Sequence, residues 1–305
     1  MKKFISLIII FIILLLAAWQ ILRQGPSRSE FEQVFGNRVV FDSDGIPTIS
    51  GKNWLEAIEI QGFVVSSQRM FQMDLIRREA AGELSEWFGQ KTFLRDILKV
   101  TEDRRAVVKE SLLELPKQER DLCDAYAKGV NNFIKMFEGR WGIEYFILGQ
   151  TPKAWSCEDT VLSLVAMGED LTATSLNEGY IQAWRDELPL SWHDFLFGRV
   201  HPWNKILIGE AHFNLAALPD AKDHIPLSKI NKNDTAQVVE TPSRALGSNN
   251  WAYRGEKGNF VANDPHLGNM VPSIWFANRI RISKKEWAVG VSVPGIYGIA
   301  LGMNQ

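Results

Sequence analysis

The sequence predicts an α+β fold, with a mostly helical first part followed by a β-rich last part. Three observations predict this order. Apolar residues recur at helical spacing over much of residues 54–188, a polar stretch fills residues 219–247, and short strand-like segments follow residue 248. With 305 residues, of which 46% are hydrophobic and 23% charged, the chain has enough apolar surface for one large core or two smaller ones.

The first residues carry a targeting signal. Lys2 and Lys3 precede an apolar run from Phe4 to Ala18, which continues with little interruption to Leu22. The run is longer than the apolar part of a signal peptide and shorter than a full membrane span, and no small-x-small cleavage site follows it. We favour an uncleaved anchor over residues 4–22; a cleaved signal peptide is the alternative. A third alternative, a buried core helix, is disfavoured, because it would need a cationic start at the very terminus of the chain.

Either form of this leader predicts an exported protein, because the positive flank stays cytoplasmic and the chain beyond about residue 25 crosses the membrane. We therefore expect the folded part at the periplasmic or another extracytoplasmic face of the membrane. A net charge of -2 and the lack of a long basic run exclude nucleic acid as a partner. Cys123 and Cys157 have no CxxC or Cys/His context, so they support neither a metal site nor a disulfide scaffold; a single bridge stays open.

Residues 38–50 alternate apolar and polar around the turn signal Asp44-Gly45, which predicts a hairpin. Helical spacing predicts helix from Trp54 to Phe88 and again over 104–137, with a break at Pro116. Two further helical runs are expected after Pro152, at 160–167 and 176–188.

The stretch 219–247 has few large apolar residues and many Lys, Asp, Asn and Thr, which is typical of a linker. Strands are predicted beyond it at 250–253, 259–262 and 287–293, and Ile296 to Met303 is expected to be a buried strand without a following partner. The predicted organisation is a leader at 1–25, a mostly helical region at 30–205, a spacer at 206–247 and the start of a β-rich chain at 248–305.

Six motifs resemble, in the same order, those of the penicillin acylase family of N-terminal nucleophile hydrolases. They are DGIPTI at 44–49, GFVVSSQRMFQMDLIRREAAGELSEWFG at 62–89, AYAKGVNNFI at 125–134, GSNNWAYRG at 247–255, VANDPHLG at 261–268 and VPGIYGIALGMN at 293–304. The resemblance implies an αββα sandwich and an exported precursor that cuts itself into two associated chains, often losing a spacer. It also implies an amidohydrolase acting on an N-acyl small molecule of the β-lactam or acyl-homoserine lactone class.

Ser248 is the nucleophile that the resemblance implies, with self-cleavage between Gly247 and Ser248. A serine hydroxyl needs a base, and the α-amine that cleavage creates can serve, because its reference pKa is about 7.7–8.0. Gly247 has no side chain to obstruct the strained turn from which the hydroxyl attacks the preceding carbonyl. The alternative is an ordinary turn leading into a strand, since Gly, Ser and Asn are common turn formers.

His266 stands where some members of that family carry a histidine and others a glutamine. An imidazole there can hydrogen-bond the α-amine of Ser248 and hold it for proton transfer. The alternative is a turn histidine beside Pro265 that satisfies only local backbone groups. A local triad of Ser248, Asp264 and His266 is disfavoured, because two of its members are almost adjacent.

Glu178 lies roughly where family members that bind calcium offer a carboxylate, so the resemblance implies one structural calcium ion. The alternative is a glutamate at a helix start, which the helix dipole favours. Arg77, Arg78 and Glu79 resemble a family pattern, and we expect ion pairs there that hold the two chains together.

Family members continue for several hundred residues past the GMN motif, a region that supplies the oxyanion hole and much of the acyl pocket. We therefore expect this sequence to be part of a longer precursor or the product of a disrupted gene. The second function class is accordingly a catalytically inactive, membrane-anchored remnant.

Overall fold

The computed structural model describes residues 11–12, 25–172, 248–256 and 258–304, and a few residues between 182 and 196. The chain divides into two compact units, Met1–Glu169 with Ser248–Gln305, and Asp170–Gly247. The second unit falls almost wholly outside the described residues, as does the predicted helical run at 176–188. The predicted anchor at 4–22 also lies outside them, except for Phe11 and Ile12. None of the helices in the described part has the length and hydropathy needed to span a bilayer.

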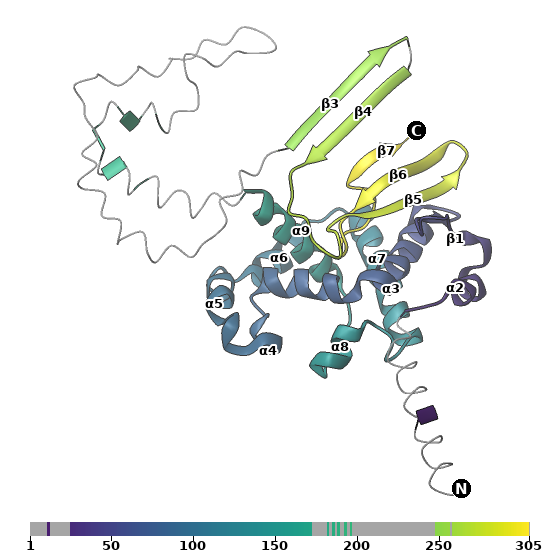
Figure 1. Ribbon diagram of the computed structural model, residues 1–305, viewed down its shortest axis with the longest axis horizontal. Coiled ribbons are helices and arrows are strands. Elements are labelled where there is room, and N and C mark those ends of the chain that lie inside the picture. Colours follow the sequence, from purple (N-terminus) through teal and green to yellow (C-terminus); the bar gives the residue numbers. More distant parts are fainter. Residues whose placement is uncertain are drawn as a thin grey trace, which may run out of the picture. The chain divides into compact units, whose positions relative to one another are not determined.

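The first unit is a mixed α+β structure, as predicted (Figure 1). Its helices are α2 (Arg28–Phe35), α3 (Trp54–Ala81), α4 (Ser85–Phe88), α5 (Phe93–Thr101), α6 (Arg104–Leu113), α7 (Lys117–Met136), α8 (Ile143–Leu148) and α9 (Cys157–Thr172), with short 3-10 turns η1 (Gly36–Arg38) and η2 (Gly89–Lys91). Its strands are β1 (Val39–Phe41), β2 (Pro47–Ser50), β3 (Ser248–Gly255), β4 (Gly258–Pro265), β5 (Phe276–Ser283), β6 (Glu286–Ser292) and β7 (Leu301–Asn304). The αββα arrangement stays a prediction.

One sheet combines strands from the early part of the sequence with strands from its late part. Its strand order is β1-β2-β5-β6-β7, and the predicted hairpin at 38–50 is confirmed as the antiparallel pair β1–β2. Strand β2 also pairs in parallel with β5, so that Thr48 lies opposite Arg279. The sheet is thus built from strands on both sides of Ser248. Strands β3 and β4 form a separate two-stranded ribbon.

Helices α3 and α7 form the centre of the helical body. Asn53 caps α3 by accepting a hydrogen bond from the backbone N–H of Glu56 at 2.9 Å. Gly82 ends the helix in the left-handed conformation, with φ 71°, which divides the predicted helix 54–88 into α3 and α4. The apolar stripe predicted on 104–137 is confirmed, because Tyr126, Val130 and Phe133 are fully buried in the core.

Asp74 is a fully buried carboxylate at the centre of an ion-pair cluster. It accepts hydrogen bonds from Arg77 Nε at 2.7 Å, from Arg78 Nε at 3.2 Å and from the Tyr145 hydroxyl at 2.9 Å. Arg77 also pairs with Asp159, and Arg78 with Glu86. The ion pairs expected of these arginines are therefore present, but their partners precede Ser248. They join α3 to α4, α8 and α9, because both guanidinium groups point into the helical body.

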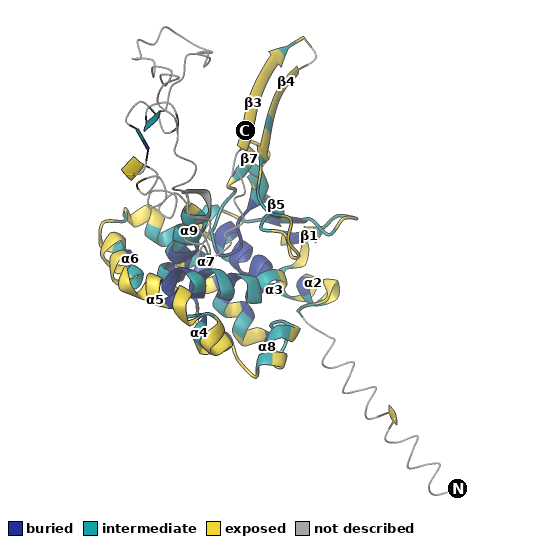
Figure 2. Ribbon diagram, turned by 60° about the vertical axis from the view of Figure 1, so that its left-hand side comes forward, coloured by how far each residue is buried: buried dark blue, intermediate teal, exposed yellow. Residues whose placement is uncertain are grey.

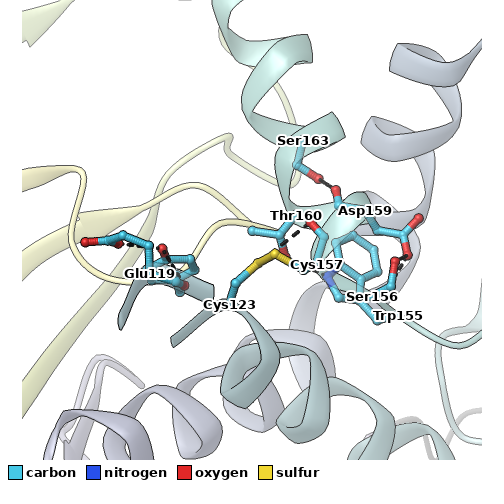
Figure 3. Close-up of a disulfide and its surroundings, with 9 residues drawn as sticks. Glu119, Cys123, Trp155, Ser156, Cys157, Asp159, Thr160 and Ser163 are labelled. Atoms are coloured by element: carbon cyan, nitrogen blue, oxygen red, sulfur yellow. Dashed lines mark hydrogen bonds between the residues drawn. A yellow bond between two sulfur atoms is a disulfide. The ribbon is translucent and has the colours of Figure 1, made fainter. Parts of the chain in front are cut away.

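Cys123 on α7 and Cys157 at the start of α9 form a disulfide (Figure 3). Around it, Trp155 Nε1 donates to Thr160 Oγ1 at 2.9 Å, and Asp159 Oδ2 accepts from the Ser156 N–H and hydroxyl. The single bridge that the sequence left open is thus present, and it ties α9 to the central pair of helices.

Removing this bridge is expected to destabilise the first unit by about 2–4 kcal/mol, because it closes a loop with a sequence separation of 34. Urea unfolding of the double variant Cys123→Ser, Cys157→Ser should show a lowered midpoint. The wild-type protein should shift in the same way after reduction, whereas the double variant should not respond to reductant. A wild-type midpoint that reduction leaves unchanged would show that the bridge carries no stability.

The predicted buried strand from Ile296 to Met303 is wrong. Gly295 and Gly298 adopt positive φ, so the chain turns there, and β7 begins only at Leu301. The strand is largely exposed and pairs antiparallel with β6. The sequence patterns also missed α2, β5, α5 and α8.

Candidate functional site

Ser248 is the first residue of β3, and Gly247 lies outside the described residues. In the β3–β4 ribbon Ser248 lies opposite Pro265, and Asn249 lies opposite Asp264. Figure 2 shows most of the ribbon in the colour of exposed residues. The register therefore brings His266, the residue after Pro265, to the end of the ribbon at which Ser248 stands.

His266 lies between two polar side chains. Its Nε2 atom is 3.1 Å from Asp264 Oδ2 and 3.2 Å from Asn249 Nδ2. A neutral imidazole satisfies one of these contacts at a time: protonated at Nε2 it donates to Asp264, and unprotonated there it accepts from Asn249. The ring is 43% exposed, so water reaches it. The histidine is thus held beside the residue that follows Ser248.

Strand alternation separates the serine hydroxyl from this cluster. Paired residues on neighbouring strands share a face and successive residues alternate, so Asn249 and Asp264 lie on one face and Ser248 on the other. The backbone nitrogen of Ser248 lies in the plane between the two faces. The arrangement fits a histidine that acts on the α-amine better than it fits a triad acting on the hydroxyl.

The segment after Ser248 is held by a buried amide network from α3. Gln61 is fully buried; its Nε2 donates to Asn278 Oδ1 at 3.1 Å and to the Gly298 carbonyl at 2.8 Å, and its Oε1 accepts from Gly298 N–H at 2.7 Å. Asn278 in turn donates to Ser292 Oγ at 2.8 Å. Sequence reasoning missed these residues. The available signal was a glutamine on the apolar face of the predicted helix 54–88.

Further contacts join residues that follow Ser248 to residues that precede it, including one on α3 and one on α7. Tyr126 on α7 accepts a hydrogen bond from Gly295 N–H at 3.3 Å, and burial raises the pKa of its hydroxyl. Arg69 Nη1 donates to the Ser273 carbonyl at 2.9 Å. Arg279 pairs with Asp42 at 2.8 Å, which lowers the pKa of that carboxyl. Residues 273–298 therefore rest on the region that precedes Ser248.

Glu178, the predicted calcium ligand, lies outside the described residues, and so does most of the predicted spacer. Within the described part of the chain, no three acidic, histidine or cysteine side chains gather as a metal site would require. The calcium ion stays a prediction.

Comparison with known proteins gives consistent results. A sequence model of the family described as penicillin amidase matches residues 37–305. Penicillin acylase 2 proenzyme of Pseudomonas sp. (strain SE83) is 27% identical over 275 residues, which are 86% of this chain and 34% of that protein. Acyl-homoserine lactone acylase QuiP of Pseudomonas aeruginosa is 25% identical over 268 residues, 85% of this chain and 31% of that protein.

Among solved structures, a thermostable penicillin G acylase from Alcaligenes faecalis is similar with a TM-score of 0.50 and 22% sequence identity. The similarity covers 57% of this chain and 97% of that chain, and it supports the fold alone. The sequence spans about a third of the length of the first curated relatives.

Proposed function

Because the chain belongs to the penicillin amidase family, we propose that it is an acylase made as a self-cleaving precursor, with Ser248 as its N-terminal nucleophile. The observation that carries this proposal is that β3 begins at Ser248, in a register that sets His266 at the same end of the ribbon. The serine at the start of the strand is exposed, so a substrate can approach it.

Self-cleavage follows from the chemistry of Gly247-Ser248. The Ser248 hydroxyl attacks the Gly247 carbonyl carbon, the peptide C–N bond breaks, and the acyl group passes from nitrogen to oxygen. Water then hydrolyses this ester, releasing the Gly247 carboxylate and restoring the hydroxyl. The freed α-amine accepts the hydroxyl proton in each later turnover, directly or through one water.

His266 is proposed as the group that positions this amine. An imidazole that accepts from the amine keeps the nitrogen lone pair directed toward the hydroxyl, and Asn249 and Asp264 limit the movement of the ring. The role needs a hydrogen-bonding side chain rather than a titrating one. Glutamine should therefore replace the histidine better than leucine does.

The proposed reaction is hydrolysis of an N-acyl small molecule, in the class of β-lactams or acyl-homoserine lactones named by the curated relatives. Produced together with the downstream region that family members carry past the GMN motif, the processed protein should release free amine from one of these substrates with kcat of about 1 per second or more. His266→Leu should lower kcat by at least about 10-fold, while His266→Gln should keep most of it. An equal loss of kcat in both variants would refute the positioning role. No hydrolysis by the wild type or by either variant would favour an inactive remnant.

We also propose that the protein is exported and held by residues 4–22. Two observations support export: the cationic and apolar start of the sequence, and the Cys123–Cys157 disulfide, since such bridges persist mainly in oxidising compartments.

A further inference from the structure

The chain leaves the predicted anchor at a firmly held residue. Gly25, three residues after the apolar run ends at Leu22, donates its N–H to the Arg140 carbonyl at 2.9 Å, and its own carbonyl accepts from Arg140 Nη2. Arg140 also grips both carboxylate oxygens of Glu30, at 2.8 and 3.0 Å. This pairing holds the pKa of Glu30 well below its usual value, so the contact persists at neutral pH.

Helix α8 begins three residues after Arg140 and carries its apolar side chains outward. Tyr145 is buried and bonded to Asp74, which fixes the helix on the body. Phe146 is 63% exposed and Ile147 is 71% exposed. Figure 2 shows exposed residues on α8 at the lower margin of the helical body.

Residues 270–271 bring two more apolar side chains close to Gly25. Met270 and Val271 are strongly exposed, Val271 completely. They line a cavity of about 680 Å³ together with Gly25, Trp141 and Gly142. The cavity lining thus brings Glu144 of α8 and residues 270–271 to Gly25, the first described residue after the predicted anchor.

From this convergence we propose that Ile143, Phe146, Ile147, Met270 and Val271 form a membrane-contacting surface that rests on the bilayer into which residues 4–22 insert. The proposal relies on the anchor proposed above. Three residues span at most about 10 Å, so an inserted run ending at Leu22 keeps Gly25 and Arg140 near the lipid headgroups. Apolar side chains held at that depth gain by entering the interface between headgroups and acyl chains.

The proposed surface and the cavity share residues. Met270 and Val271 belong to the surface, and they line the cavity beside Gly25, to which the predicted anchor leads. His266 precedes Met270 by four residues, which places the candidate site on the segment that leads into this surface.

The test is lipid-borne quenching of a fluorophore on single cysteines in the otherwise intact protein, reconstituted in vesicles. Both native cysteines are in the disulfide, so Ile147→Cys carries the only free thiol. The matched control is Leu113→Cys, 80% exposed at the end of α6, a helix that Figures 1 and 2 both draw apart from α8. Neither exposed site should lose more than about 0.5 kcal/mol of stability on substitution.

Brominated lipids should quench the label at 147 at least about twofold more than the label at 113. Equal quenching at the two sites would overturn the proposed membrane contact. The exposed residues of α8 would then be covered by another part of the protein or by a second copy. A carbonate wash of the same vesicles tests the anchor separately, because only a spanning segment resists extraction. Quenching at 147 in a protein that carbonate removes would refute the anchor and keep the surface.

Discussion

Replacing Ser248 by alanine is expected to leave the protein as one uncleaved chain without acylase activity. Alanine has no oxygen to attack the Gly247 carbonyl, so the acyl shift has no first step and the α-amine is never released. The same substitution removes the nucleophile for substrate, so the loss should be complete rather than graded. Because Ser248 is exposed at the start of β3, the variant should fold as the wild type does.

Denaturing electrophoresis of protein recovered from the cells that produce it measures this outcome. The wild type should give two fragments and Ser248→Ala a single chain. Ser243→Ala is the matched control, since it removes a hydroxyl from the same segment five residues upstream and should be processed normally. Normal processing of Ser248→Ala would mean that another residue, or a separate protease, makes the cut.

Replacing Gly129 by alanine is expected to disrupt the helical body. A Cβ atom at this position of α7 would lie 1.8 Å from the Glu59 carbonyl oxygen on α3. Non-bonded carbon and oxygen atoms never approach so closely. The Cβ atom is fixed to one backbone and the oxygen belongs to the other, so the two helices must move apart. The Gly62 contact with the Tyr126 carbonyl has the same character, at 2.2 Å. The expected loss is about 3 kcal/mol or more, which is large against an ordinary total of about 5–15 kcal/mol.

Chemical unfolding followed by far-ultraviolet circular dichroism tests this expectation. Gly168→Ala on α9 is the matched control, because a Cβ there meets no atom within 4 Å, and alanine favours the helix by about 1 kcal/mol over glycine. The control should be as stable as the wild type or more so, while Gly129→Ala should unfold at lower denaturant or fail to accumulate. Equal midpoints for the two variants would contradict the close crossing of α3 and α7.

The elements that local pattern specifies could be predicted from the sequence. The hairpin β1–β2, the helices α3 and α7 and the break near Pro116 follow from periodicity and turn chemistry, and all of them are confirmed. Strand β5 was missed because its buried positions include the polar Asn278, whose partner Gln61 is 217 positions away. Such a strand shows no clean alternation, and only the tertiary contact explains its burial.

Helix α5 was missed although its apolar residues recur at helical spacing, and its orientation could not have been predicted from them. Its buried residues are Asp96 and Lys99, whereas Leu94 and Leu98 are exposed. The usual relation between apolar character and burial is reversed, because Asp96 accepts the Ser85 N–H and Lys99 pairs with Glu169. Sequence periodicity cannot reveal which face of such a helix is inward.

The residues of the candidate site were proposed from the sequence and stay a prediction, and the sequence specifies their geometry only in part. Motif order singled out Ser248 and His266, and the β3–β4 register brings them to the same end of one ribbon. Only the structure shows Asn249 and Asp264 beside the imidazole, and the opposite faces of hydroxyl and ring follow from a pairing register that local sequence does not specify.

The most direct test of the account is the N-terminal sequence of the downstream fragment in the wild-type protein. Edman degradation or mass spectrometry of that fragment should read Ser-Asn-Asn-Trp, with a free α-amine on the serine. An unprocessed chain, or a fragment that begins at any other residue, would contradict Ser248 as an N-terminal nucleophile.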